Sequence, residues 1–233
     1  MTPVAAIPQY LHDTYWWAYV HPNAVRLFER QWLVNLILWG NFARLRDAAL
    51  AELGGVLAGR TLQVACVYGD FTPRLAARVA PGGSLDVVDV LPIQLANLRR
   101  KLPAGAPVAL LQRDAADLGL ADASYDRVVL FFLLHEMPED VRRRTLAEAL
   151  RVVKPGGDVL IVDYHRPASW HPLRPVMQLV LRWFEPFAMD LWHRDVACWL
   201  PEGGAARHKR TFWGGLYQML KIVGPDRDRG GAP

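Results

Sequence analysis

Five short apolar segments alternate with helix-like segments between residues 60 and 165, and polar residues lie close to the carboxyl end of most of them. Strands that alternate with helices along a chain form a mostly parallel sheet with helices on its faces. We therefore predict an α/β fold with a doubly wound, Rossmann-like sheet. The five expected strands are residues 62–68, 85–90, 108–111, 127–133 and 159–162.

Three helix starts follow these strands. Thr72 before Pro73 is typical of an N-cap and a first helical position, and we expect that helix to run through residues 75–79. A second helix is expected over residues 92–101. Two acids directly after Pro138 suit the positive end of a third helix. These positions place a helix in each of three strand-to-strand connections.

The flanks of the strand region hold all nine tryptophans, at positions 16, 17, 32, 39, 170, 183, 192, 199 and 213. Before the strands, apolar residues at helical spacing predict a helix over residues 24–53. After them we expect an aromatic-rich insertion at about residues 166–206 and two strands over residues 210–223, split at a glycine pair. We accordingly divide the chain into a helical cap (1–56), a Rossmann-like domain (57–223) and a flexible tail (224–233).

Composition excludes several classes of protein. The net charge is +4 and the arginines are scattered among acids, so we expect no nucleic-acid partner. Cys66 and Cys198 form neither a disulfide framework nor a metal-ligand spacing, which indicates a reducing compartment. No apolar run approaches the length of a membrane span, and the first residues do not resemble a signal peptide. We expect a cytoplasmic protein with at most peripheral contact with the inner face of a membrane.

Polar residues gather where the expected strands end, which is the edge of a parallel sheet that binds ligands. Asp89 follows Gly69 by twenty residues and is placed to accept hydrogen bonds from a ribose diol. Asp114 suits the exocyclic amine of an adenine. The segment VYGDFT lacks the G-x-G-x-x-G turn, which argues against a dinucleotide. The other strand-end residues are Tyr68, Asp70, Asp117, His135, Glu136, Tyr164 and His165.

The segments LQVACVYGD, VVDVLP, RDAADL, SYDRVV and VVKPGGDVLIVDY resemble the class I S-adenosylmethionine-dependent methyltransferases. The first motif departs from that superfamily, because Gln63, Ala65 and Val67 stand where an acid and glycines are usual and only Gly69 is retained. The resemblance implies that S-adenosylmethionine is bound by Gln63, Val67, Tyr68, Gly69, Asp70, Asp89, Val90, Asp114 and Ala115.

This departure, together with the flanks YLHDTYWWAYVHP, LVNLILWGNFARL, FFLLHEMPE, VDYHRP and RTFWGGLYQ, is similar to the rhodoquinone biosynthesis protein family. That resemblance implies the replacement of a ring methoxy group of ubiquinone by an amino group. It also implies S-adenosylmethionine as the amino donor and a divalent metal such as Mn²⁺. Carboxylates suit this metal, so Asp89 and Asp114 are candidate ligands, a role that competes with ribose and adenine binding.

The uncharged side chain of Gln63 is the basis of a physical hypothesis for the implied amino transfer. The usual acid lies near the α-ammonium of the methionine moiety and favours the protonated amine. An ammonium has no lone pair, so an uncharged Gln63 would leave the amine available as a nucleophile. Val67 and Tyr68 add bulk where glycines let the ligand approach the backbone. The alternative is a variant methyltransferase.

The candidates for catalytic acid–base work are His135, Glu136, Tyr164, His165 and Tyr68. A histidine beside an acid is often only a hydrogen-bonded strand-end pair, so a structural role stays open for each. The alternative function is a methyltransferase acting on a quinol or another apolar small molecule. A third is a non-catalytic binding protein, against which the polar strand ends argue. The Trp-rich flanks, with Arg174, Arg182 and Arg194, suit a membrane interface where a polyprenyl quinone resides.

Overall fold

The computed structural model describes residues 6–15, 25, 27–201 and 206–224. The chain forms two compact units, Met1–Gly119 and Leu120–Pro233. The described residues before β1 belong to the same unit as the first three strands, and the division into a cap, a Rossmann-like domain and a tail stays a prediction. Trp16 and Trp17 and the tail beyond Gly224 lie outside the described residues.

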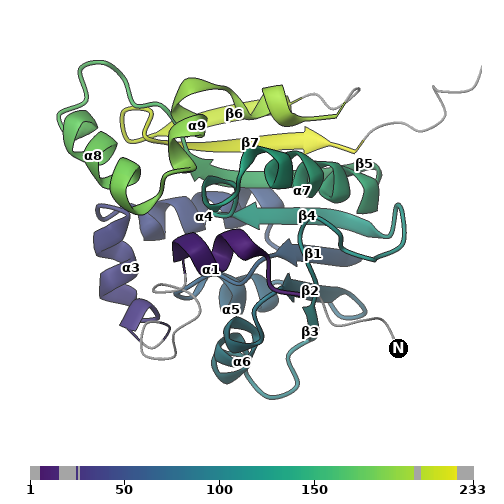
Figure 1. Ribbon diagram of the computed structural model, residues 1–233. Coiled ribbons are helices and arrows are strands. Elements are labelled where there is room, and N and C mark those ends of the chain that lie inside the picture. Colours follow the sequence, from purple (N-terminus) through teal and green to yellow (C-terminus); the bar gives the residue numbers. More distant parts are fainter. Residues whose placement is uncertain (1–5, 16–24, 26, 202–205, 225–233) are drawn as a thin grey trace, which may run out of the picture. The chain divides into compact units, whose positions relative to one another are not determined.

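The first unit contains three parallel strands in the order β3-β2-β1 (Figure 1). The register pairs Val64 with Val88 and Asp89 with Gln112, so β1 and β2 end close to one another. Helix α6 packs against β2 and β3. The elements are β1 (Arg60–Val64), α5 (Phe71–Ala76), β2 (Ser84–Asp89), α6 (Pro92–Lys101) and β3 (Val108–Gln112).

Two boundaries in this unit differ from the prediction. β1 ends at Val64, not at residue 68, because Ala65 adopts a left-handed conformation with φ 70° and turns the chain out of the strand. α5 begins at Phe71 with Asp70 as its N-cap, so Thr72 lies inside the helix. Pro73 still falls in the first turn, where its missing N–H has no helical partner to lose.

The helix predicted over residues 24–53 is broken. Trp39 and Gly40 have positive φ angles of 51° and 77°, which end one helix and start another. The Asn41 side chain donates to the carbonyls of Leu38 and Trp39 and fixes this turn. The described helices before β1 are α1 (Gln9–Tyr15), α3 (Gln31–Ile37) and α4 (Phe42–Leu53).

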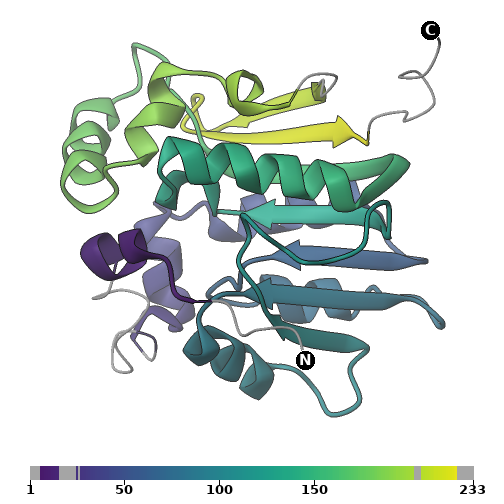
Figure 2. The same ribbon diagram turned by 45° about the vertical axis from the view of Figure 1, so that its right-hand side comes forward.

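The second unit has its strands in the order β4-β5-β7-β6. β4 and β5 are parallel, whereas β7 pairs antiparallel with both β5 and β6. Residues 128–131 and 159–162, in the carboxyl-terminal halves of β4 and β5, are buried, and α7 lies along these strands (Figure 2). The elements are β4 (Tyr125–Phe131), η2 (Leu134–Glu136), α7 (Glu139–Val152), β5 (Val153–Tyr164), β6 (Ala206–Phe212) and β7 (Tyr217–Val223).

β5 is much longer than the predicted segment 159–162, because Gly156, with φ 73°, lets the expected turn remain part of the strand. Between β5 and β6 lie α8 (Arg174–Phe184), α9 (Ala188–His193) and η3 (Val196–Trp199). Pro175 lies in the first turn of α8, where it does not interrupt the helix. The two C-terminal strands separated at Gly214 and Gly215 are confirmed, as is the α/β class. No helix in the described part of the chain is both long enough and apolar enough to cross a bilayer.

Candidate active site

Gln63 is a fully buried residue near the carboxyl end of β1. Its Nε2 donates to the Ala65 carbonyl at 2.9 Å, whereas its Oε1 is buried and accepts no hydrogen bond from any described residue. A buried acceptor without a donor is unfavourable by about 1–3 kcal/mol. A ligand ammonium or hydroxyl at this position would satisfy it.

The loop after Gln63 keeps a glycine-like conformation at Ala65, with φ 70°. Ala65 N donates to Val88 O at 2.9 Å, which ties the loop to β2. At the end of the loop Gly69 has φ 81°, and a Cβ on it would lie 2.8 Å from Phe42 Cζ. Gly69 is therefore required by both its backbone conformation and its close packing.

The Asp89 carboxylate is buried at the end of β2. Its Oδ2 accepts from Cys66 N and its Oδ1 from Leu91 N, both at 2.8 Å. Burial outweighs these bonds and raises the pKa of Asp89 to about 6. Leu91, Cys66 and Val90 all supply donors to this carboxylate, and the binding of a ribose hydroxyl here stays a prediction. Burial and the nearby Asp89 also raise the pKa of the Cys66 thiol well above its usual value, which keeps the thiol protonated.

Asp114 follows β3, and its Oδ1 accepts from Ala116 N at 2.8 Å in a tight turn that includes Ala115. At Val90 the carbonyl accepts from Gln112 Nε2 at 3.2 Å. The described residues contain no group of three or more His, Cys, Asp or Glu that could hold a metal ion. Asp89 and Asp114 each bind backbone amides instead. These residues do not fit the metal that the family resemblance implies, and we derive no step through one.

Asp70 was predicted to bind the cofactor, and its carboxylate contacts two guanidinium groups. Arg46 Nη1 lies 2.7 Å and 2.9 Å from its oxygens, and Arg74 also donates to it. Although burial would raise the pKa of Asp70, these arginines lower it overall. The carboxylate therefore stays charged and fixes the start of α5 to α4.

The loop over residues 66–69 is held by three residues that the sequence did not single out. Lys101 Nζ donates to Val67 O at 3.1 Å, to Gly69 O at 2.8 Å and to Glu29 Oε1 at 2.8 Å. Glu29 also accepts from Gly69 N at 3.2 Å and from Asn97 Nδ2 at 2.6 Å. Lys101 and Asn97 belong to a helix with many surface residues, so no sequence signal distinguishes them.

Tyr68 is fixed on two sides within the same unit. Its hydroxyl accepts from Gln94 Nε2 at 2.8 Å, and its ring stacks on Phe28 with centroids 5.9 Å apart. This arrangement gives the side chain one orientation. A catalytic role for Tyr68 stays a prediction.

In the second unit the central residue is Asp163, which was not predicted. It is fully buried on β5 and its Oδ2 accepts from the backbone amides of residues 133, 134 and 135, at 2.8–3.3 Å. Its Oδ1 accepts from Tyr164 N at 2.7 Å and lies 2.9 Å from His135 Nδ1. An acid inside the apolar segment VLIVDY was the available signal.

His135, Glu136 and Tyr164 lie together around this carboxylate. Burial lowers the pKa of His135, but the charge and hydrogen bond of Asp163 outweigh it and raise the pKa to about 9. His135 Nε2 lies 3.7 Å from Glu136 Oε1, and its ring meets Tyr164 edge-on at 4.9 Å. Burial raises the pKa of the Tyr164 hydroxyl well above its usual value. At neutral pH this cluster holds an imidazolium and a protonated tyrosine.

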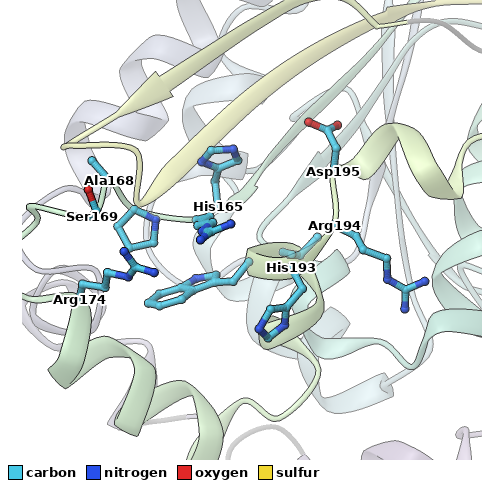
Figure 3. Close-up of a pocket in the computed structure, with 11 residues that line it drawn as sticks. His165, Ala168, Ser169, Arg174, His193, Arg194 and Asp195 are labelled. Carbon is cyan, nitrogen blue, oxygen red and sulfur yellow. The ribbon is translucent and has the colours of Figure 1, made fainter.

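His165 lies beside a pocket of about 490 Å³ (Figure 3). Its Nδ1 is 2.7 Å from Gly215 O, so Nδ1 donates and Nε2 is left as an acceptor. Burial lowers the pKa of His165, which keeps the ring neutral. Arg194 extends away from His165 and pairs with Glu139. The pocket is lined by His165, Arg166, Pro167, Ala168, Ser169, Arg174, Leu191, Trp192, His193, Arg194 and Asp195.

The fold is shared with solved methyltransferase structures, and residues 61–157 match the family model described as a methyltransferase domain. An O-methyltransferase family protein from Burkholderia thailandensis superposes with a TM-score of 0.67 at 20% identity, covering 88% of this chain and 60% of that one. The N-methyltransferase NodS from Bradyrhizobium japonicum, in complex with S-adenosyl-L-homocysteine, gives 0.58 at 17%, covering 79% and 85%. The predicted fold is thus confirmed.

Two curated relatives add sequence similarity. The ubiquinone/menaquinone biosynthesis C-methyltransferase UbiE of Pseudomonas paraeruginosa is 31% identical over 141 residues, 59% of this chain and 54% of its own. The chain thus spans about half the length of this relative. An uncharacterized methyltransferase of Synechocystis is 27% identical over 207 residues, 88% of this chain and 93% of its own. The predicted likeness to methyltransferases is confirmed, and the likeness to the rhodoquinone family stays a prediction.

Proposed function

We propose that this protein is an S-adenosylmethionine-dependent transferase that acts on the ring of a quinone or quinol. Two observations carry the proposal: the buried Asp89 carboxylate accepts a hydrogen bond from the loop after β1, and Gln63 Oε1 at the end of β1 is buried without a donor. Together they offer acceptors for a ribose diol and an α-ammonium, which S-adenosylmethionine has. The substrate class is supported by the similarity to UbiE, a C-methyltransferase of ubiquinone and menaquinone biosynthesis.

Each unit contributes its own residues to this function. In the first unit Asp89 would bind the ribose and Asp114 the adenine amine, while Lys101 and Glu29 hold the loop over residues 66–69. In the second unit the neutral His165 would accept a proton from a quinol hydroxyl at its Nε2. His135, held as an imidazolium by Asp163, would donate to a ring oxygen.

Methyl transfer is the reaction that the relatives favour. A second candidate, amino transfer with displacement of a ring methoxy group, is favoured by one specific observation. Gln63 is uncharged and buried where methyltransferases usually hold the α-ammonium with an acid. Without that charge the amine of S-adenosylmethionine loses its proton more readily, and its lone pair can attack the ring carbon while the methoxy group leaves as methanol. Proton transfer from Cα to a ring oxygen would then reduce the ring and form an imine, which water hydrolyses to the ring amine and an α-keto acid.

Labelled S-adenosylmethionine distinguishes these reactions. The full chain is incubated with ubiquinone, or with its reduced form, and with S-adenosylmethionine that carries ¹³C in the methyl group and ¹⁵N in the amine, with and without Mn²⁺. Mass spectrometry of the quinone follows. A gain of ¹³C supports methyl transfer, and a gain of ¹⁵N with loss of a methoxy group supports amino transfer. A quinone with neither label contradicts the proposed function.

A further inference from the structure

Helix α8 and the residue Trp170 expose large apolar side chains. The exposed fractions are 73% for Trp170, 60% for Leu179 and 77% for Trp183. Val176, Leu179 and Trp183 recur at i, i+3 and i+7 and so share one face of α8. Another face packs inward through Met177 and Leu181, each 1% exposed. The helix therefore has a second apolar face that the fold leaves in water.

The same segment has an excess of positive charge. Residues 166–184 contain three arginines and no acid. In the described part of the chain none of Arg166, Arg174 and Arg182 forms an ion pair. Elsewhere in this unit Arg142 pairs with Asp190, and Arg143 and Arg194 both pair with Glu139. Unpaired arginines beside exposed apolar side chains complement an anionic lipid surface.

This surface is continuous with the pocket beside His165. Ser169 and Arg174 line the pocket, Trp170 directly follows Ser169, and Arg174 is the first residue of α8 (Figure 3). The exposed apolar side chains of Trp170 and α8 thus begin next to the pocket. A molecule with a polar ring and a long apolar tail could place its ring in the polar pocket and its tail against the adjacent apolar surface.

We propose that α8 and Trp170 dock this protein on a bilayer that contains anionic phospholipid. Trp170, Val176, Leu179 and Trp183 enter the boundary between headgroups and acyl chains, and Arg174 and Arg182 lie among the phosphates. The purpose of docking rests on the proposed function, because a polyprenyl quinone could keep its tail in the bilayer while its ring enters the pocket. The docking itself does not depend on catalysis.

The test is co-sedimentation of the full chain with vesicles. We expect wild type to sediment with phosphatidylglycerol–phosphatidylcholine vesicles, less so as salt rises, and weakly with phosphatidylcholine alone. The double variant Leu179→Gln, Trp183→Ser should bind about tenfold more weakly or worse. The matched control is Leu36→Gln, Trp32→Ser on α3, where the same residue types are 63% and 59% exposed. It should bind like wild type.

Three results would overturn the docking proposal. These are absence of sedimentation at low salt, an equal loss in the α3 variant, and a wild-type dimer that the α8 variant makes monomeric while vesicle binding is unchanged. The last result would assign the face to a second copy of this chain. Turnover of a tail-less quinone without vesicles tests the proposed function separately. If wild type fails there yet sediments normally, only the function is wrong.

Discussion

Ala65 holds a left-handed backbone conformation, with φ 70°, in the loop that carries the proposed cofactor contacts. An L-residue in this conformation is unfavourable by roughly 1–2 kcal/mol, whereas glycine adopts it freely. In the motif that these residues resemble, a glycine is usual at this position. The hydrogen bonds from Ala65 N to Val88 O and from Gln63 Nε2 to Ala65 O hold the strained residue in place.

We predict that Ala65→Gly raises the free energy of unfolding by about 0.5–1 kcal/mol, because relief of strain exceeds the added entropy of the unfolded chain. Chemical denaturation measures it. The control is Ala51→Gly, at an exposed position inside α4, which should lower the free energy of unfolding by about 1 kcal/mol. A destabilised Ala65→Gly variant would contradict the assignment of strain to this residue.

Gln63 tests the hypothesis about the transferred group. Gln63→Glu places a carboxylate beside the α-ammonium, so we predict that S-adenosylmethionine binds at least as tightly. If the reaction is amino transfer, the rate at neutral pH should fall, because each unit of raised amine pKa lowers the unprotonated fraction about tenfold. The rate should then recover in part at higher pH. A variant that aminates as fast as wild type would make Gln63 incidental.

At the scale of elements, Asp163 connects the end of β5 to the turn after β4. Its carboxylate accepts from the backbone amides of residues 133–135 and from the ring of His135, so one side chain fixes both the 3₁₀ helix η2 and the imidazole. Removal of one partner from a buried charge pair of this kind strongly lowers the free energy of unfolding, because the other charge is left buried and unpaired. The position of His135 thus depends on β5 and not only on the segment in which it lies.

The His135–Asp163 pair predicts a pH dependence of stability. The pKa of His135 is about 9 in the folded chain, against 6.5 for a histidine side chain free in water, so its stabilising effect is complete below pH 6.5 and is lost as the pH rises through about 9. We expect the free energy of unfolding to fall by about 1–3 kcal/mol across this window. Denaturation at a series of pH values, with the His135 ring followed by NMR, measures both quantities.

The matched variant is Asp163→Asn. It should be less stable than wild type by about 3–5 kcal/mol, and the decrease in stability toward high pH should disappear. If the variant keeps the full pH dependence, another group produces it.

Alternation of apolar segments with helix signals was enough to predict every strand of the two units to within a few residues, apart from the length of β5. The ends of two elements were predicted wrongly, at Ala65 and at Trp39, because a single residue with a left-handed backbone conformation ends each element. Neither alanine nor tryptophan marks such a conformation in a sequence. For the candidate site, strand-end position selected Asp89 and His135, whose roles stay predictions. It missed Lys101, Glu29 and Asp163, whose roles depend on contacts between segments far apart in the sequence.

At the scale of the whole molecule, the account requires S-adenosylmethionine to bind the native chain. Asp89 is the residue through which this is tested. Its pKa of about 6 is raised from 3.8 by burial, so a bound ribose that needs the ionised carboxylate will bind less well as the pH falls below 6. The same burial makes the ionised form unfavourable for folding, so the contribution of Asp89 to stability is present below pH 3.8 and is lost as the pH rises through 6.

Calorimetric titration of wild type, Asp89→Ala and Asp86→Ala with S-adenosylmethionine is the most direct measurement. Asp86 lies on the same strand, is similarly buried and pairs with Arg60, so it controls for loss of a buried β2 acid. We predict binding by wild type that weakens below pH 6, a loss of about 1.5–3 kcal/mol of binding free energy in Asp89→Ala, and wild-type affinity in Asp86→Ala. Absence of binding by folded wild type, or an unchanged affinity in Asp89→Ala, would contradict the account.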